Sequence, residues 1–132
     1  MKHIEVVCAV IEYDGKFLCM QRANRGSLST AGKWEFPGGK IEPEESQESA
    51  LRRELQEEMD YEVDVVKYLM TVCHQYPDFH ITMHAYLCMA NTETFNRKEH
   101  INHKWLHPAE LSLLDWADAD APIIKHLTNI EL

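Results

Sequence analysis

The sequence predicts a single α+β domain. Short runs rich in Val, Ile and Leu are separated by turn residues, which is typical of strands, and one stretch repeats apolar residues at helical spacing. The chain has 132 residues, of which 45% are hydrophobic, and this suits one domain with its own core. We therefore expect residues 1–132 to form one domain, without internal repeats or linkers.

The first part of the chain is expected to form a hairpin followed by a loop. Residues 4–12 are rich in Val and Ile and predict a strand. The pair Asp14-Gly15 favours a two-residue hairpin turn, so residues 16–22 are expected to be the return strand. Residues 23–33 contain Asn, Gly, Ser and Thr and indicate a loop.

The middle of the chain predicts an amphipathic helix. Leu51, Leu55 and Met59 recur every four residues, so they should pack against a sheet. Pro43 fits a first helical turn, where its missing N–H costs nothing. The two glutamates that follow Pro43 suit the positive end of a helix dipole.

The rest of the chain is expected to add strands and then short helices, with a turn at Tyr76-Pro77. The predicted strands cover residues 61–72, 79–89 and 103–106, a polar loop covers 90–100, and helices begin at Pro108 and span 119–129.

Three carboxylates share one face of the predicted helix. Glu54, Glu57 and Glu58 are neighbours there, because residues three and four apart on a helix lie side by side. Each like-charged pair costs on the order of a few tenths of a kcal/mol. A divalent cation would relieve this repulsion, and Mg²⁺, Mn²⁺ and Ca²⁺ prefer such hard oxygen ligands. A solvated acidic helix is the alternative, but it explains neither the pair Gly38-Gly39 nor the register of Arg53.

The spacing around this helix resembles the Nudix box. Gly39 is followed after five residues by Glu45, and seven residues later come Arg53-Glu54-Leu55 and Glu57-Glu58. Asp60 is the one departure, since the family has glycine there; Tyr61 takes the next, apolar place.

Asp60 falls where the helix should end, a position that often needs a positive φ. Asp adopts positive φ more readily than most other non-glycine residues. We expect a cost of about 1 kcal/mol in stability. Activity should survive, because no metal-facing carboxylate is replaced.

The resemblance implies a mixed β-sheet sandwiched between α-helices and metal-dependent hydrolysis of a phosphoanhydride. Arg53 would orient a neighbouring glutamate through its fork of donors. Glu54 is the first choice for the general base, although family members differ on this role, and Glu57 and Glu45 complete the implied catalytic set. Mg²⁺, or Mn²⁺, would be held by the carbonyl of Gly38 and by Glu54, Glu57, Glu58 and Glu99.

Outside the box, the chain resembles the MutT-like nucleoside triphosphate pyrophosphohydrolases over nearly its whole length. The matching segments are residues 21–23, 34–42, 80–82 and 119–122. The resemblance implies phosphate contacts from Arg22 and Lys40 and a base pocket formed by Ile4, Val6, Phe36, Phe79, Ile81 and Asp120. The alternatives are a surface arginine at Arg22, an ordinary loop acid at Glu99 and ordinary core residues in the pocket set.

The residue at position 120 indicates which base the substrate carries. The subgroup that acts on CTP and modified pyrimidine nucleotides has aspartate in an Ala-Asp-x-Pro context, as here, whereas the subgroup that removes oxidised guanine nucleotides has asparagine. The resemblance therefore implies hydrolysis of CTP, dCTP or modified pyrimidine nucleotides to a monophosphate and pyrophosphate.

Four alternatives remain. They are an 8-oxo-dGTP pyrophosphohydrolase, a nucleotide-sugar Nudix hydrolase, a non-catalytic nucleotide-binding module and a structural calcium site. Nucleotide-sugar enzymes usually carry extra N-terminal elements, and binding modules typically lose box glutamates.

Charge and cysteine usage limit the partners. The formal net charge of −9 argues against binding a nucleic acid polymer. The four cysteines, Cys8, Cys19, Cys73 and Cys88, are expected to be buried free thiols, as in a reducing cytoplasm. We expect a cytoplasmic monomer without a membrane segment. His100, His103 and His107 are interpreted as surface or loop histidines rather than as a zinc site.

Overall fold

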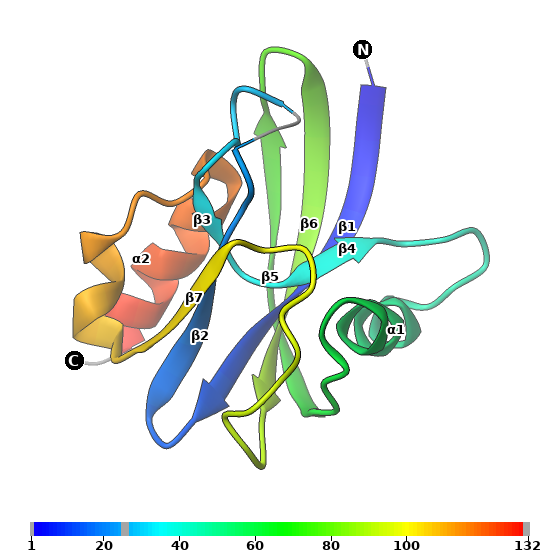
Figure 1. The fold of residues 1–132 in the computed structure, drawn as a ribbon. Coiled ribbons are helices and arrows are strands. Elements are labelled where there is room, and N and C mark those ends of the chain that lie inside the picture. Colours follow the sequence, from blue (N-terminus) through cyan, green and yellow to red (C-terminus); the bar gives the residue numbers. More distant parts are fainter. Residues whose placement is uncertain (1, 25–26, 131–132) are drawn as a thin grey trace.

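A computed structural model describes residues 2–24 and 27–130 and contains a seven-stranded sheet with one helix on each side (Figure 1). This confirms the predicted α+β class. The strands are β1 (Lys2–Tyr13), β2 (Lys16–Gln21), β3 (Trp34–Glu35), β4 (Gly38–Lys40), β5 (Asp64–Gln75), β6 (Phe79–Met89) and β7 (Asn102–Leu106). The helices are α1 (Gln47–Met59) and α2 (Ala121–Ile130), with 3₁₀ segments at η1 (Pro108–Leu113) and η2 (Asp118–Asp120).

The sheet is mixed. Its main path runs β3-β2-β1-β6-β5, while β4 pairs with β1 and β7 pairs with β2. The long pairing of β1 with β6 is parallel, and the other strand pairs are antiparallel. Asp14 and Gly15 connect β1 to β2 with φ values of 52° and 77°, and two positive φ values are what a type I′ hairpin turn requires.

Successive side chains of β1 lie on alternate faces of the sheet, and each face has its own hydrophobic core. Val7, Ala9 and Ile11 pack in the core that also contains Leu51, Leu55 and Met59 of α1. Cys8 and Val10 pack in the core that also contains Ile123, Ile124 and Leu127 of α2. The four-residue repeat of α1 is therefore confirmed as a buried stripe.

Helix α1 begins later than predicted. Ser46 is its N-cap, and the Ser46 hydroxyl accepts a hydrogen bond from the Ser49 N–H at 3.1 Å. Glu44 has a φ of 65°, which is incompatible with a right-handed helix. The prediction that Pro43 occupies the first helical turn is therefore wrong, because a side-chain cap at Ser46 sets the boundary.

Helix α1 ends as predicted. Asp60 has a φ of 49° and a ψ of 42°, which is the left-handed conformation. The Asp60 N–H donates to the carbonyl of Gln56 at 3.1 Å, and the Tyr61 N–H donates to that of Leu55 at 3.3 Å. These bonds satisfy carbonyl groups at the end of the helix.

Three smaller differences separate the structure from the predictions. The segment of residues 34–40, to which no strand was assigned, forms two short strands, and the segment from Pro108 is a 3₁₀ helix. All four cysteines are free, but Cys73 is exposed, because it lies on the outer strand β5. Among the described residues, no helix is long and apolar enough to cross a membrane.

Candidate active site

A cavity of about 730 Å³ opens beside β1, β4 and the edge of α1. Most of the residues that the sequence predicted for binding line this one cavity. The predicted base-pocket residues that line it are Ile4, Val6, Phe36, Phe79, Ile81 and Asp120. The predicted metal and phosphate ligands that line it are Gly38, Glu54, Glu58, Glu99, Arg22 and Lys40.

Several carboxylates in the cavity lining lie close to one another. The pKa of Glu58 is raised to about 8, first by burial and then by the negative charges of Glu54, Glu99 and Glu35. Burial also raises the pKa of Glu54, with Glu57 and Glu99 adding to the effect and Arg53 opposing it. Such a cluster favours a bound cation, and its oxygen donors fit Mg²⁺ or Mn²⁺. Within residues 2–24 and 27–130, however, no three His, Cys, Asp or Glu side chains are arranged to hold one ion.

Glu57 lies outside this cluster. Its side chain is 59% exposed, and its Oε1 accepts a hydrogen bond from Nη1 of Arg53 at 2.9 Å. Glu54 and Glu58 are one helical turn apart and face the cavity, whereas Glu57 is one turn from Arg53 and faces that side chain. The structure therefore brings Glu54 and Glu58 together in the cavity, while Glu57 binds Arg53 outside it.

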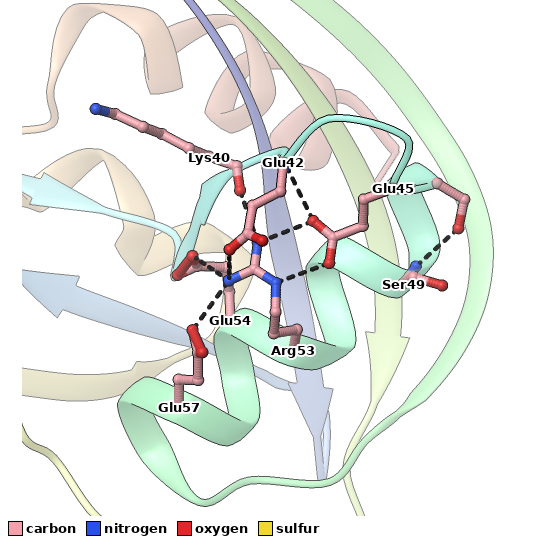
Figure 2. A network of polar contacts seen from close by, with 8 residues as sticks. Lys40, Glu42, Glu45, Ser49, Arg53, Glu54 and Glu57 are labelled. Carbon is pink, nitrogen blue, oxygen red and sulfur yellow. Dashed lines mark hydrogen bonds and ion pairs between the residues drawn. The ribbon is translucent and has the colours of Figure 1, made fainter.

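Arg53 connects the helix to the loop before it (Figure 2). Its guanidinium donates to both oxygens of Glu45, from Nε at 2.7 Å and from Nη2 at 2.9 Å. It also donates to Oε1 of Glu54 at 3.0 Å and to the carbonyl of Lys40 at 2.9 Å. The hydrogen bond from Arg53 is the main reason that the pKa of Glu45 falls to about 2. Arg53 and Glu45 lie outside the cavity lining and act by holding Glu54 and the β4 backbone.

The two adjacent glycines are each required by a close neighbour. A Cβ at Gly39 would lie 2.2–2.6 Å from the carboxylate atoms of Glu54. A Cβ at Gly38 would lie 2.0 Å from the carbonyl oxygen of Val7. Gly39 therefore makes room for a cavity carboxylate, and Gly38 makes room for the backbone of β1.

Two polar residues that the sequence did not assign to the site also line the cavity. Glu35 accepts a hydrogen bond from Nη1 of Arg22 at 3.3 Å, and Nε2 of His100 lies 2.9 Å from the other Glu35 oxygen. His100 lies in the loop after β6, as expected, but it is not a surface residue, because its side chain is only 8% exposed and lines the cavity. The acidic Glu35 between Trp34 and Phe36 was the available signal, since a charge in an apolar run needs a partner.

Asp120 also lines the cavity and is 4% exposed. Its Oδ2 accepts a hydrogen bond from the Phe36 N–H at 3.0 Å. Burial, and then the charge of Glu35, raise the pKa of Asp120 well above its ordinary value. A buried carboxyl with one oxygen already bound can present the other to a ligand.

Aromatic side chains surround Asp120. The rings of Tyr76 and Phe79 stack with centroids 4.8 Å apart, and both residues line the cavity. The Tyr76 hydroxyl accepts a hydrogen bond from the Ala119 N–H at 2.9 Å, which ties the ring to the residue before Asp120. Tyr76 was not predicted as a pocket residue, because its Tyr-Pro-Asp context indicates only a turn.

Known proteins are similar to this chain in sequence and in fold. The CTP pyrophosphohydrolase of Escherichia coli (strain K12) is 41% identical over 125 residues, which cover 95% of this chain and 91% of that protein. The 8-oxo-dGTP diphosphatase of the same strain is 29% identical over 130 residues, covering 98% and 100%. The crystal structure of a MutT protein from Methanosarcina mazei Go1 has a TM-score of 0.86 at 22% identity, covering 98% and 96%. The family model of the NUDIX domain matches residues 1–127, so the chain belongs to the Nudix family.

Proposed function

We propose that this protein hydrolyses nucleoside triphosphates to a nucleoside monophosphate and pyrophosphate with Mg²⁺, and that cytidine nucleotides are its preferred substrates. The observation that carries the proposal is one cavity lined both by the carboxylates Glu54, Glu58 and Glu99 and by apolar and aromatic residues with the buried Asp120. A polyphosphate fits the carboxylates through a metal, and a base fits the apolar and aromatic part.

In the carboxylate part of the cavity, Glu54, Glu58, Glu99 and the carbonyl of Gly38 would hold the ion. Bound Mg²⁺ neutralises phosphate charge and makes a bound water more acidic. Glu57 would first have to leave Arg53 to join these ligands. Arg22 and Lys40, which line the same cavity, are placed to bind the phosphates.

Glu54 is the proposed general base. It is largely buried, its pKa is raised by burial, and Arg53 fixes one of its oxygens. A carboxylate with a raised pKa accepts a proton from water more readily than an ordinary glutamate. Arg53 would keep Glu54 oriented while Glu45, on the far side of the guanidinium, keeps Arg53 in place.

In the apolar and aromatic part, Asp120 would read the base edge. An ionised carboxylate accepts hydrogen bonds, and the exocyclic amino group of cytosine donates one. The 41% identity to a CTP pyrophosphohydrolase supports the same choice.

The second candidate is hydrolysis of 8-oxo-dGTP. The raised pKa of Asp120 favours it, because a protonated carboxyl can donate a hydrogen bond to a base carbonyl. The presence of Glu54 and Glu58 in the cavity, with Arg53 bound to Glu54 from outside it, argues against a non-catalytic binding module.

A substrate panel tests the proposal. Values of kcat/KM would be measured with Mg²⁺ for CTP, dCTP, 5-methyl-dCTP, GTP, ATP, 8-oxo-dGTP and ADP-ribose. We expect the cytidine nucleotides to exceed GTP and ATP by roughly 5- to 150-fold, which corresponds to about 1–3 kcal/mol for one good base contact. Asp120→Asn should reduce this preference. A panel led by 8-oxo-dGTP or ADP-ribose would contradict the cytidine assignment.

A further inference from the structure

The side chain of Asp60 binds the loop that follows β6. Its Oδ2 accepts hydrogen bonds from Nδ2 of Asn96 at 3.0 Å and from Nζ of Lys98 at 3.2 Å. Asp60 is the one position where the box departs from the family pattern, and a glycine there could make neither contact. The departure therefore adds a link between α1 and this loop.

Backbone groups at the same helix end reinforce the link. The Asn96 N–H donates to the carbonyl of Met59 at 2.9 Å, and Nζ of Lys98 donates to the carbonyl of Glu57 at 3.3 Å. A positive side chain at the C-terminal end of a helix also interacts favourably with the helix dipole. The end of α1 thus holds residues 96–98 through side chain and backbone together.

The next residue along the loop is Glu99, which lines the cavity and raises the pKa of Glu58 and Glu54. On its far side, His100 contacts Glu35 at 2.9 Å, and the Ile101 N–H donates to the carbonyl of Gln21 at 3.0 Å. Glu99 is therefore held between two anchors, one at the end of α1 and one at the strands β2 and β3.

We propose that Asp60 is a positioning residue that sets Glu99 against Glu54 and Glu58, so that the end of α1 controls the geometry of the divalent-ion site. This inference rests on the proposed function, in which Glu99 helps to hold the ion. In this chain Asp60 supplies both the left-handed turn and the side-chain contacts with Asn96 and Lys98, whereas a glycine would supply only the turn.

The test is Mn²⁺ affinity at low ionic strength, measured from the free-ion electron paramagnetic resonance signal without substrate. Asp60→Gly keeps the left-handed turn, so its melting temperature should stay close to that of the parent protein. Its Mn²⁺ affinity should fall about threefold to tenfold, the range for one or two net hydrogen bonds. Amide hydrogen exchange of residues 96–100 should become faster. Asp60→Asn keeps an acceptor oxygen and should restore most of the affinity.

Two controls separate positioning from general loosening of the loop. Tyr61→Phe removes the hydrogen bond from the Tyr61 hydroxyl to the Thr92 carbonyl, at the start of the same loop, and should leave Mn²⁺ affinity unchanged. In a Glu99→Gln background, Asp60→Gly should have little further effect, because the two residues act through one contact.

The outcomes are distinguishable. If the parent protein binds Mn²⁺ but Asp60→Gly binds it equally well, the role of Asp60 is overturned and the proposed function stands. The role of Asp60 is also overturned if Asp60→Gly lowers Mn²⁺ affinity in the Glu99→Gln background as much as it does in the parent protein. If the parent protein binds no Mn²⁺, the proposed function fails, and the role of Asp60 fails with it.

Discussion

Gly38 and Gly39 are adjacent, yet a methyl group at each would meet a different neighbour. At Gly39 it would collide with the end of the Glu54 side chain, which can move aside, whereas at Gly38 it would collide with the fixed backbone of Val7. Gly39→Ala should therefore lower kcat about 100-fold with little change in melting temperature, because displacing a general base, the role proposed for Glu54, by about 1 Å costs that much. Gly38→Ala should lose about 1–3 kcal/mol of stability through overpacking.

Steady-state kinetics and thermal unfolding of the two variants check this pair. A Gly39→Ala protein with full activity would show that the position of Glu54 does not matter for turnover. Equal destabilisation of both variants would show that the two glycines have the same structural role.

The buried Asp120 should make stability depend on pH. Its folded pKa is raised by burial and by Glu35, so the folded state binds the proton more tightly than the unfolded chain, where the value is about 3.9. This contribution is complete below about pH 4 and is lost as pH rises through the folded pKa. Asp120→Asn removes the buried charge, so it should be more stable than the parent protein at pH 8 and not at pH 4.

Urea unfolding at both pH values measures the difference. Asp118→Asn is the matched control, because Asp118 lies in the same 3₁₀ segment with a side chain that is 67% exposed. Its effect should be small at both pH values. A stability difference for Asp120→Asn that does not change with pH would mean that Asp120 is equally ionised in the folded and unfolded states.

At the residue scale, the sequence predicted which carboxylates share a face of the helix better than it predicted which distant residues contact each other. The cavity carboxylates Glu54 and Glu58 follow from helix spacing, and the structure places both in the cavity. Glu35 and His100 could not be found in this way, because their contact joins residues 65 positions apart. Such contacts depend on which loop passes over which strand, and the spacing of residues within one segment does not predict this.

At the scale of elements, Ser46 sets the start of the helix that carries the box. Its hydroxyl caps the Ser49 N–H, so Ser46→Ala should cost about 0.5–2 kcal/mol of stability. Activity should be kept at low temperature, because Ser46 does not line the cavity. Chemical unfolding measures the loss.

Ser49→Ala is the control for the cap, since it keeps the backbone N–H and should have little effect. A loss as large as that of Ser46→Ala would show that side-chain packing rather than capping is responsible.

The strongly periodic elements were predictable and the shortest ones were not. The long strands and α1 repeat apolar residues over enough positions to reveal their period. Strands β3 and β4 contain two and three residues, too few to show one, although β4 is the strand that carries both glycines. The helix start was placed too early because Pro43 suits a first turn, while the cap at Ser46 decides the boundary.

At the scale of the whole molecule, the site depends on the parallel pairing of β1 with β6. That pairing places Ile4 beside Ile81 and Lys2 beside Phe79, and all four residues line the cavity. Hydrophobic periodicity does not reveal which strands pair, and the resemblance to the Nudix box implied only a mixed sheet between helices. One face of α1 packs in the core while its acidic edge meets the cavity that these strands form, so folding assembles both parts of the site together.

We propose that this cavity cleaves a nucleoside triphosphate between its inner phosphates with a divalent ion. The most direct test is ³¹P nuclear magnetic resonance of CTP incubated with the protein and Mg²⁺. We expect CMP and pyrophosphate as the first products, and no turnover when a chelator is in excess. CDP and orthophosphate as products, or unchanged turnover in the chelator, would contradict it.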